Sequence, residues 1–470
     1  MQKFVQRYCI IETLMKPEQS NPSTNSKNKA TVSPARRAAF DILRRVETEG
    51  SYASVLLAAL ANLSREDRAL VQELTLGVLR QQKTLDYFIE RYTQRKIKKL
   101  DLPVVLALRL GLYQIRFLSR IPQSAAVNES VNLVKMARKM SATGMVNAAL
   151  RNAARHLEEK PGAAIKDKFE RLSVELSHAP WMLAHWAASF GEDEMQNLAL
   201  ANNQTPETAF RVNTLRAGSE EMITRLEVEG LKTRVSKVAA GAYVIEGGHL
   251  AALTPFVEEG LIYIQDEASQ LVSLLLDVKP GQRILDMCAA PGSKTSHIAA
   301  LTQNKAQIIA CDIHAHRLET LIANCQRLGV TSVETIQLAA TEELPFATAE
   351  KFDRVLIDAP CTGTGTLRRN PEIKWRLTLE DIKRLAEIQY VLLERGGQLL
   401  GTGGRLIYST CSVERQENEA VVQKFLETNT AFHLVQADAP DDCLTAEGFV
   451  RTFPHRQGTD GFFTAVIEKR

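Results

Sequence analysis

The sequence from Ser269 to its end alternates between short apolar runs and longer amphipathic stretches, and this alternation constrains the fold more than any other feature. The apolar runs include "RILDMCA", "QIIACDI", "FDRVLIDAP" and "GRLIYSTCS", and helical patterns such as "AHRLETLIANCQRLG" and "LEDIKRLAEIQYVLLER" separate them. Strands that alternate with helices indicate a mostly parallel sheet with helices on both faces. Residues 266–470 are therefore predicted to form a doubly wound α/β domain.

Chemically reactive side chains stand where these predicted strands end: Asp286, Cys288, Asp312, Asp358, Cys361 and Cys411. The carboxyl ends of parallel strands lie along one edge of a sheet, where ligands bind. The two thiols of Cys361 and Cys411 are therefore expected to face each other across one site.

Two further regions precede this domain. Residues 34–160 are predicted to be all-α, because segments such as "LPVVLALRLGLYQIRFL" space apolar residues three and four positions apart. Residues 161–265 are predicted to be a helical linker and a small α+β subdomain, because apolar and polar residues alternate in segments such as "TAFRVNTLR" and "AYVIEG". Residues 1–33, which are rich in Ser, Asn, Pro and Lys towards their end, are predicted to be a flexible tail. The expected architecture is multidomain.

Composition excludes several classes of protein. The seven cysteines show no C-x-x-C spacing, which disfavours a disulfide scaffold, a zinc ribbon or another metal site. No segment is apolar enough to span a bilayer, so we expect a cytoplasmic enzyme with free thiols. The formal net charge of +3 permits nucleic-acid binding without demanding it.

The run "DMCAAPGSKTSH" joins a predicted strand to a predicted helix through small residues. Ala289, Ala290 and Gly292 let the backbone approach a ligand closely, and Pro291 stiffens the turn. The run is not a P-loop, and it is typical of a cofactor loop, with an ordinary strand-to-helix turn as the alternative. Asp312, at the end of the next strand, is placed either to accept the hydroxyls of a ribose or to cap the following helix.

Three motifs in this order, "CAAPGSK", "DAPCTGTGTLRRNPEIKW" and "YSTCSVERQENE", resemble those of the RNA 5-methylcytosine methyltransferases of the NOL1/NOP2/Sun group. The helical segment from about residue 34 to 156 resembles the antitermination factor NusB. The resemblance implies a NusB-like RNA-binding domain and a Rossmann-like methyltransferase domain. It also implies S-adenosylmethionine as cofactor, ribosomal RNA as partner, and carbon 5 of a cytosine in small-subunit (16S) ribosomal RNA as the methylated atom.

Cytosine chemistry explains why two thiols are useful. Carbon 5 is a weak nucleophile until a thiolate adds to carbon 6, and a second polar group helps when the carbon 5 proton and the thiolate leave. The resemblance implies that Cys411 is the nucleophile and that Cys361 assists proton removal and product release. The residues alone leave the order of the two roles open, and buried cysteines that act as small hydrophobes are the alternative.

The resemblance further implies a cofactor set: Cys288, Ala289, Ala290, Pro291, Gly292, Ser293, Lys294, Asp312 and Asp358. The backbone of Cys288 is the expected contact. Asp358 is also suited to accept from the exocyclic amine of cytosine, with a turn-forming role before Pro360 as the alternative.

Basic residues follow Cys361 and surround Trp375, which suits a phosphate backbone and an unstacked base. The predicted RNA-binding residues are Arg368, Arg369, Lys374 and Arg376, with a solvated charged face as the alternative.

Two departures from the family pattern are visible. Leu338 and Ala339 stand where many members carry a Gly-Asp pair near the cofactor adenine, and Ser293 replaces a usual glycine. Two rival functions stay open, a transfer RNA cytosine-5 methyltransferase and a non-catalytic RNA-binding assembly factor. Oligomeric state is not predicted.

Overall fold

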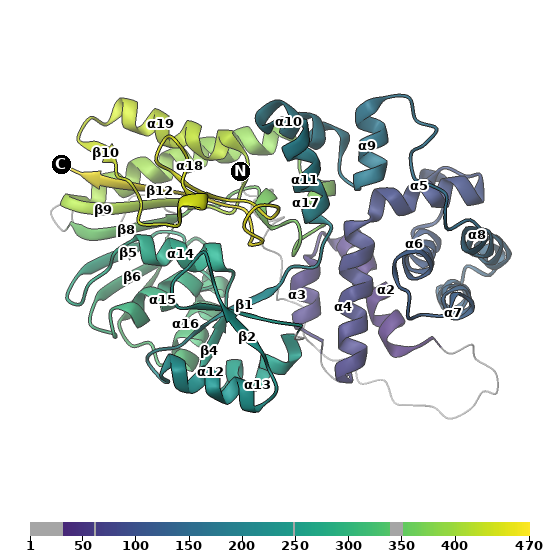
Figure 1. Ribbon diagram of the computed structural model, residues 1–470, viewed down its shortest axis with the longest axis horizontal. Coiled ribbons are helices and arrows are strands. Elements are labelled where there is room, and N and C mark those ends of the chain that lie inside the picture. The colour runs from purple at the N-terminus through teal and green to yellow at the C-terminus, as the bar shows by residue number, and fades with distance from the viewer. Residues whose placement is uncertain (1–31, 61–62, 248–249, 339–350) are drawn as a thin grey trace. The chain divides into compact units, whose positions relative to one another are not determined.

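A computed structural model describes residues 32–60, 63–247, 250–338 and 351–470. Nearly all of the predicted tail therefore lies outside the described residues. The chain divides into two compact units (Figure 1). The helical unit is the chain up to Gln204 together with Leu367–Arg376, and the sheet unit is Thr205–Thr366 together with Leu377–Arg470.

The helical unit is built from amphipathic helices, as the spacing of its apolar residues predicts. Its elements are α2 (Pro34–Glu49), α3 (Ala53–Ala58), α4 (Arg65–Arg80), α5 (Gln82–Thr93), η2 (Ile97–Lys99), α6 (Leu102–Phe117), α7 (Gln123–Met136), η3 (Met140–Ala142), α8 (Thr143–Arg155), α9 (Lys168–Leu176), α10 (Pro180–Phe190), α11 (Glu192–Asn202) and α17 (Ile373–Arg376). Leu74, Phe88 and Leu106 are fully buried in one core. The all-α prediction for residues 34–160 is confirmed.

Two features of this unit were not visible in the sequence. Helices α9 to α11, which lie in the predicted helical linker, belong to it, and the chain passes to the sheet unit after Gln204. The segment Leu367–Arg376 also belongs to it, although the residues on either side are in the sheet unit. The chain therefore leaves the sheet unit just after Cys361 and returns ten residues later.

The small α+β subdomain is confirmed as a four-stranded antiparallel sheet in the order β2-β3-β1-β4. Its elements are β1 (Thr208–Val212), α12 (Ser219–Val228), β2 (Thr233–Val235), β3 (Ala242–Ile245), η4 (Leu250–Leu253), α13 (Thr254–Glu258) and β4 (Ile262–Ile264). Phe210, Leu226 and Ile262 are completely buried between the strands and α12.

The large sheet has eight strands, of which β5, β6, β7, β8 and β9 run parallel. The order is β10-β12-β9-β8-β5-β6-β7, and β11 pairs with β12. The strands are β5 (Arg283–Asp286), β6 (Gln307–Asp312), β7 (Val333–Gln337), β8 (Phe352–Asp358), β9 (Leu400–Thr410), β10 (Phe432–Leu434), β11 (Val450–Thr452) and β12 (Phe462–Lys469).

Helices cover both faces of this sheet, which confirms the doubly wound fold class. Helices α14 (Glu267–Leu275), α15 (Ser293–Leu301) and α16 (Ala315–Leu328) lie on one face, and α18 (Leu379–Leu399) and α19 (Glu419–Thr428) on the other (Figure 1). Short 3-10 turns η5 (Thr364–Thr366), η6 (Arg415–Glu417) and η7 (Asp441–Cys443) lie between the larger elements. Successive strand residues enter opposite cores, since Ile284 packs in one and Leu285 in the other.

Parallel pairing aligns the carboxyl ends of the central strands at one edge. Asp358 is level with Ser409 across the pair β8 and β9, and Asp286 is level with Leu356 across β5 and β8. The reactive residues just beyond these positions are therefore brought together, as the strand alternation predicts.

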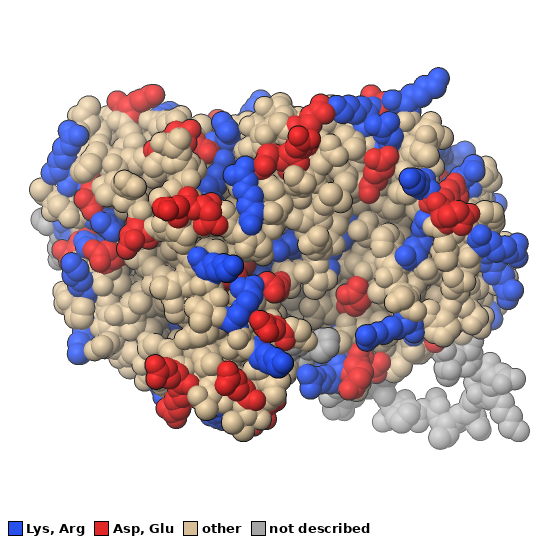
Figure 2. All heavy atoms as spheres, in the orientation of Figure 1, with Lys and Arg blue, Asp and Glu red and all other residues tan. Residues whose placement is uncertain are grey.

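Charged side chains of both signs are interspersed over the face shown in Figure 2. This distribution agrees with the near balance of 58 basic and 55 acidic residues. Within the described ranges, no helix is long and apolar enough to cross a membrane.

Candidate active site

The two predicted catalytic cysteines lie side by side. Cys361 follows β8, Cys411 follows β9, and their sulfur atoms are 3.3 Å apart, within hydrogen-bonding distance. Both side chains are partly exposed. A site at this edge therefore presents two free thiols to the same ligand.

The two thiols are not equivalent. The hydrogen bond to Cys411, followed by burial, raises the pKa of Cys361 well above its ordinary value. Cys361 therefore keeps its proton more firmly than an ordinary thiol, and it can donate a hydrogen bond to the sulfur of Cys411.

Backbone contacts fix the loops that carry the thiols. The amide of Gly365 donates to the carbonyl of Cys411 at 2.9 Å, and the amide of Gly461 donates to the carbonyl of Gly365 at 2.8 Å. A Cβ atom on Gly365 would lie 1.9 Å from the carbonyl oxygen of Gly461, so no larger residue fits between the two segments. The close approach explains why the loop "CTGTG" contains glycine at this position.

The predicted cofactor loop turns sharply into α15. Gly292 has a φ of 96°, in the left-handed region, and a Cβ atom there would approach Leu321 to 2.8 Å. Two side chains of α16 bind the carbonyl groups of the loop: Arg317 contacts Ala290 at 2.6 Å and Asn324 contacts Pro291 at 3.0 Å. The small residues thus form a tightly held backbone turn at the strand ends.

Lys294 and Asp358 form an ion pair beside this turn. The ammonium of Lys294 donates to the carboxylate of Asp358 at 2.6 Å, with the lysine side chain only 6% exposed and that of Asp358 31% exposed. The ammonium is also 5.3 Å from the ring centre of Phe462. Sequence reasoning named both charged residues but missed the pairing, for which the only signal was that β5 and β8 are neighbours in this fold class.

Asp286 lies beneath the same turn. Its carboxylate accepts from the hydroxyl of Thr295 at 2.7 Å, and its other oxygen is buried without a hydrogen-bond partner among the described residues. Burial raises the pKa of Asp286 to about 7. The residue therefore holds the start of α15 and is nearly inaccessible to solvent, at 1% exposure.

Asp312 is buried at the end of β6. One carboxylate oxygen accepts from the amide of His314 at 3.0 Å, and the other is 3.3 Å from the guanidinium of Arg317. His314, not Asp312, precedes the first residue of α16. The carboxylate stiffens the turn into that helix, and Arg317 connects it to the cofactor loop.

The remaining described thiols are buried or unreactive. Burial and then the neighbouring carboxylates raise the pKa of Cys288 well above its ordinary value, which agrees with a backbone role. Burial likewise raises the pKa of Cys311 to about 12, of Cys325 to about 11 and of Cys443 to about 12.

The predicted RNA-binding residues have structural contacts inside the helical unit, which corrects that prediction for three of the four. Lys374 is fully buried, and its ammonium donates to the carbonyls of Arg80 and Ser177 and to Asn203. Arg376 donates to the carbonyls of Val46, Gly50 and Ser51.

Arg368 is only 5% exposed, and its carbonyl accepts from Arg80. The charged groups of Lys374 and Arg376 bind oxygens of the helical unit, and Arg368 is buried, so these three residues are not surface contacts for phosphate. Arg369 is half-buried and stays a predicted RNA contact.

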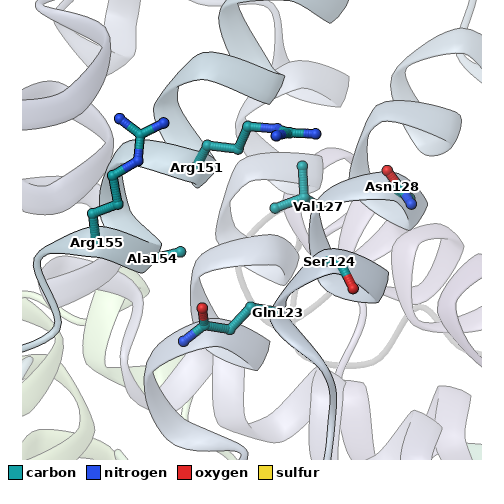
Figure 3. Close-up of a pocket in the computed structure, with 7 residues that line it drawn as sticks. All are labelled: Gln123, Ser124, Val127, Asn128, Arg151, Ala154 and Arg155. Atoms are coloured by element: carbon teal, nitrogen blue, oxygen red, sulfur yellow. The ribbon is translucent and has the colours of Figure 1, made fainter.

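A pocket of about 290 Å³ lies between α7 and α8 of the helical unit (Figure 3). Its lining is Gln123, Ser124, Val127, Asn128, Arg151, Ala154 and Arg155. None of the residues predicted for catalysis or for cofactor binding is among them. Ala339, at the departure from the family pattern, lies outside the described residues. Within those residues, no cluster of His, Cys, Asp and Glu is arranged to hold a metal ion.

Comparison with known proteins identifies the family. Residues 273–468 match the family model described as 16S rRNA methyltransferase RsmB/F. The probable ribosomal RNA small subunit methyltransferase B of Bacillus subtilis (strain 168) is 34% identical, with 93% of this chain and 98% of that protein covered. This chain belongs to the RsmB/F family of 16S rRNA methyltransferases. The family predicted from the three motifs is thereby confirmed.

Other matches extend over the whole RsmB-type architecture. Residues 33–155 match the NusB family, and residues 178–249 match the ferredoxin-like domain of RsmF/B-like methyltransferases. The probable ribosomal RNA small subunit methyltransferase B of Synechocystis sp. (strain PCC 6803) is 36% identical, over 93% of this chain and 99% of that protein.

Two solved structures are similar. One, described as PH0851, has a TM-score of 0.79 and 30% identity, over 94% of this chain and 100% of that one. The other, NSun6 from Pyrococcus horikoshii with SFG, has a TM-score of 0.56 and 25% identity, over 61% of this chain and 97% of that one.

Proposed function

We propose that this family member transfers a methyl group from S-adenosylmethionine to carbon 5 of a cytosine in 16S rRNA, through a covalent adduct with Cys411. The observation that carries the proposal is the pair of free thiols 3.3 Å apart at the carboxyl edge of a parallel sheet. Both thiols are free and partly exposed. Two such thiols in contact are suited to nucleophilic catalysis on a base.

The two cysteines support the addition step and the release step. The Cys411 thiolate adds to carbon 6 and pushes electron density onto carbon 5. After methylation of carbon 5, its proton leaves to a base, the electron pair re-forms the double bond, and the bond from carbon 6 to sulfur breaks. Cys361 keeps its proton and donates a hydrogen bond to the departing sulfur, because its pKa is raised.

The turn into α15 fits a nucleotide-like cofactor. Gly292 is in the left-handed region and leaves no room for a Cβ atom, and Ala289 and Ala290 are small, so the backbone of the turn is open to a ligand. Buried acidic side chains lie at the ends of two neighbouring strands. When bound, S-adenosylmethionine would supply the methyl group. Asp312 is the proposed ribose partner, and the Lys294–Asp358 pair is the proposed polar contact between cofactor and base.

Methyl transfer to defined RNA tests the proposal. Purified full-length protein, labelled S-adenosylmethionine and unmodified 16S rRNA should give label in RNA, and nuclease digestion with mass spectrometry should place it in 5-methylcytosine. A transfer RNA substrate in parallel should stay unlabelled. Label in another nucleoside would overturn the carbon 5 assignment, and label only in transfer RNA would overturn the substrate.

The same experiment addresses the non-catalytic alternative. An assembly factor would bind 16S rRNA without any transfer of label. The contact between the two thiols and the hydrogen-bonded cofactor turn both favour catalysis, because an RNA scaffold needs neither.

A further inference from the structure

A buried carboxylate lies directly beneath the thiol pair. Glu417, at the end of η6, is completely inaccessible to solvent. Its oxygens accept hydrogen bonds from the amide of Thr362 at 2.9 Å, from the hydroxyls of Thr362 and Ser412 at 2.5 Å each, and from the amide side chain of Gln389 at 3.0 Å.

These partners connect the carboxylate to both cysteine loops. Thr362 is the residue after Cys361, and Ser412 is the residue after Cys411. The two hydroxyls are also 3.1 Å from each other. Gln389 donates in addition to the carbonyl of Pro360, the residue before Cys361, at 2.9 Å. The side chain of Glu417 therefore binds the residue that follows each cysteine.

The arrangement is energetically unusual, which favours a functional reason for it. The four groups that donate to the carboxylate are neutral, so among the described residues no cation compensates its charge at hydrogen-bonding distance. Burial raises the pKa of Glu417 to about 7. A buried acid without a cation costs stability unless its hydrogen bonds are well made.

We propose that Glu417 is a positioning residue that sets the distance between the sulfur atoms of Cys361 and Cys411. Its catalytic consequence depends on the proposed function, but the spacing of the thiols does not. The carboxylate accepts from the hydroxyls of both Thr362 and Ser412, and we call this pair of contacts the clamp. Because each of these residues follows a cysteine, the clamp keeps the two sulfur atoms in contact.

Glu417→Gln is the most informative substitution because it keeps the size of the side chain. One carboxylate oxygen accepts from two hydroxyls, and the other accepts from two N–H groups. With the glutamine oxygen on the two N–H groups, its NH₂ faces the two hydroxyls and donates to them, so the short charge-assisted O–H···O⁻ contacts become longer and weaker neutral N–H···O contacts. The clamp is weakened without opening a cavity.

Disulfide formation measures the spacing directly. The full-length protein, without RNA or cofactor, is treated with diamide, which takes up both thiol hydrogens as the Cys361–Cys411 disulfide forms. Alkylation at timed intervals and peptide mass spectrometry give the rate. We expect Glu417→Gln to slow this disulfide at least tenfold. A wild-type rate would overturn the proposal.

The sign of the effect separates positioning from electrostatics. The negative charge of Glu417 helps to raise the pKa of Cys361, so its removal alone would favour thiolates and accelerate the reaction. A faster reaction in Glu417→Gln would therefore assign the residue a purely electrostatic role and reject the clamp. Glu468→Gln, which removes a carboxylate bonded to Arg405 on the same sheet, is the matched control and should react at the wild-type rate.

Methyl transfer provides the second measurement. A thiol displaced by about 1 Å should lower kcat by roughly 10- to 100-fold, with the KM for RNA unchanged. If the wild-type protein transfers no methyl group, the proposed function fails, while the disulfide rate still decides the role of Glu417. Should Glu417→Gln not fold, Thr362→Val removes one hydroxyl contact and should slow the disulfide by a smaller factor; an unchanged rate would again reject the clamp.

Discussion

At the scale of single residues, the two thiols differ in how firmly they hold their protons, and we propose different roles for them. Cys361 holds its proton because of the hydrogen bond to Cys411 and its burial, which leaves Cys411 as the better candidate for the nucleophile. A charged pair at the same edge of the sheet, Lys294 with Asp358, is largely buried at the ammonium end and open at the carboxylate end. The site therefore combines two thiols with a polar ion pair.

Substitution of each cysteine should give a different product. We expect Cys411→Ala to abolish methyl transfer, because no sulfur remains to add to carbon 6. Cys361→Ala should allow addition but slow release, so that a protein–RNA adduct survives denaturing electrophoresis. Wild-type protein is the control. An active Cys411→Ala variant, or an adduct that accumulates in it, would reverse the assignment.

Gly365 should be intolerant of a side chain. An alanine Cβ atom would lie 1.9 Å from the carbonyl oxygen of Gly461, so Gly365→Ala must force the cysteine loop away from the segment before β12. Such overpacking costs about 1–3 kcal/mol in the free energy of unfolding. We expect a lower melting temperature and a loss of kcat. Gly144→Ala, which meets nothing within 4 Å and lies in α8, is the control and should not lower stability.

At the scale of elements, the segment Leu367–Arg376 has the most unexpected role. It directly follows the Cys361 loop in sequence, yet it packs as part of the helical unit. Ser54, Ala53 and Leu79 provide further contacts, to Asn370, Glu372 and Trp375. These contacts, together with those of Lys374 and Arg376, hold the segment in the helical unit.

Lys374→Met should destabilise the helical unit. The substitution leaves three buried acceptors without their donor, which costs roughly 3 kcal/mol in the free energy of unfolding. All three tryptophans of the chain, Trp181, Trp186 and Trp375, are in this unit, so urea denaturation followed by tryptophan fluorescence reports on it. Lys383→Met, at an exposed position, is the control. Unchanged stability with weaker RNA binding would restore the original phosphate-binding prediction.

At the scale of the whole molecule, buried acids make stability depend on pH. Glu417 and Asp286 have pKa values of about 7 in the folded protein, against ordinary values of 4.5 and 3.8. Between these values the folded state binds more protons than the unfolded state. The free energy of unfolding therefore falls as pH rises towards 7 and levels off above it.

Glu417→Gln should remove its share of this dependence. The stability of the wild type minus that of the variant should fall by about 3 kcal/mol between pH 4.5 and pH 8, since each pKa unit corresponds to about 1.4 kcal/mol. Urea denaturation followed by circular dichroism at several pH values measures the difference. A difference that is constant or rises with pH would contradict the raised pKa.

The sequence by itself determined the fold class, the α+β subdomain and the set of strand ends that carry Asp286, Asp312, Cys361 and Cys411. The reason is that hydrophobic periodicity is a local property, and parallel strands place their carboxyl ends at one edge whatever lies between them. Motif resemblance added the family, and the comparisons confirm it.

Only the tertiary structure decided which groups touch. The 3.3 Å sulfur contact joins residues 50 positions apart, and the clamp at Glu417 joins Thr362 and Ser412 in the same way. The sequence does not distinguish a basic side chain on the surface from one whose charge is bound to buried acceptors. The prediction that Lys374 contacts RNA is wrong for this reason. Long-range packing sets burial and hydrogen bonding, and neither has a local signature in the sequence.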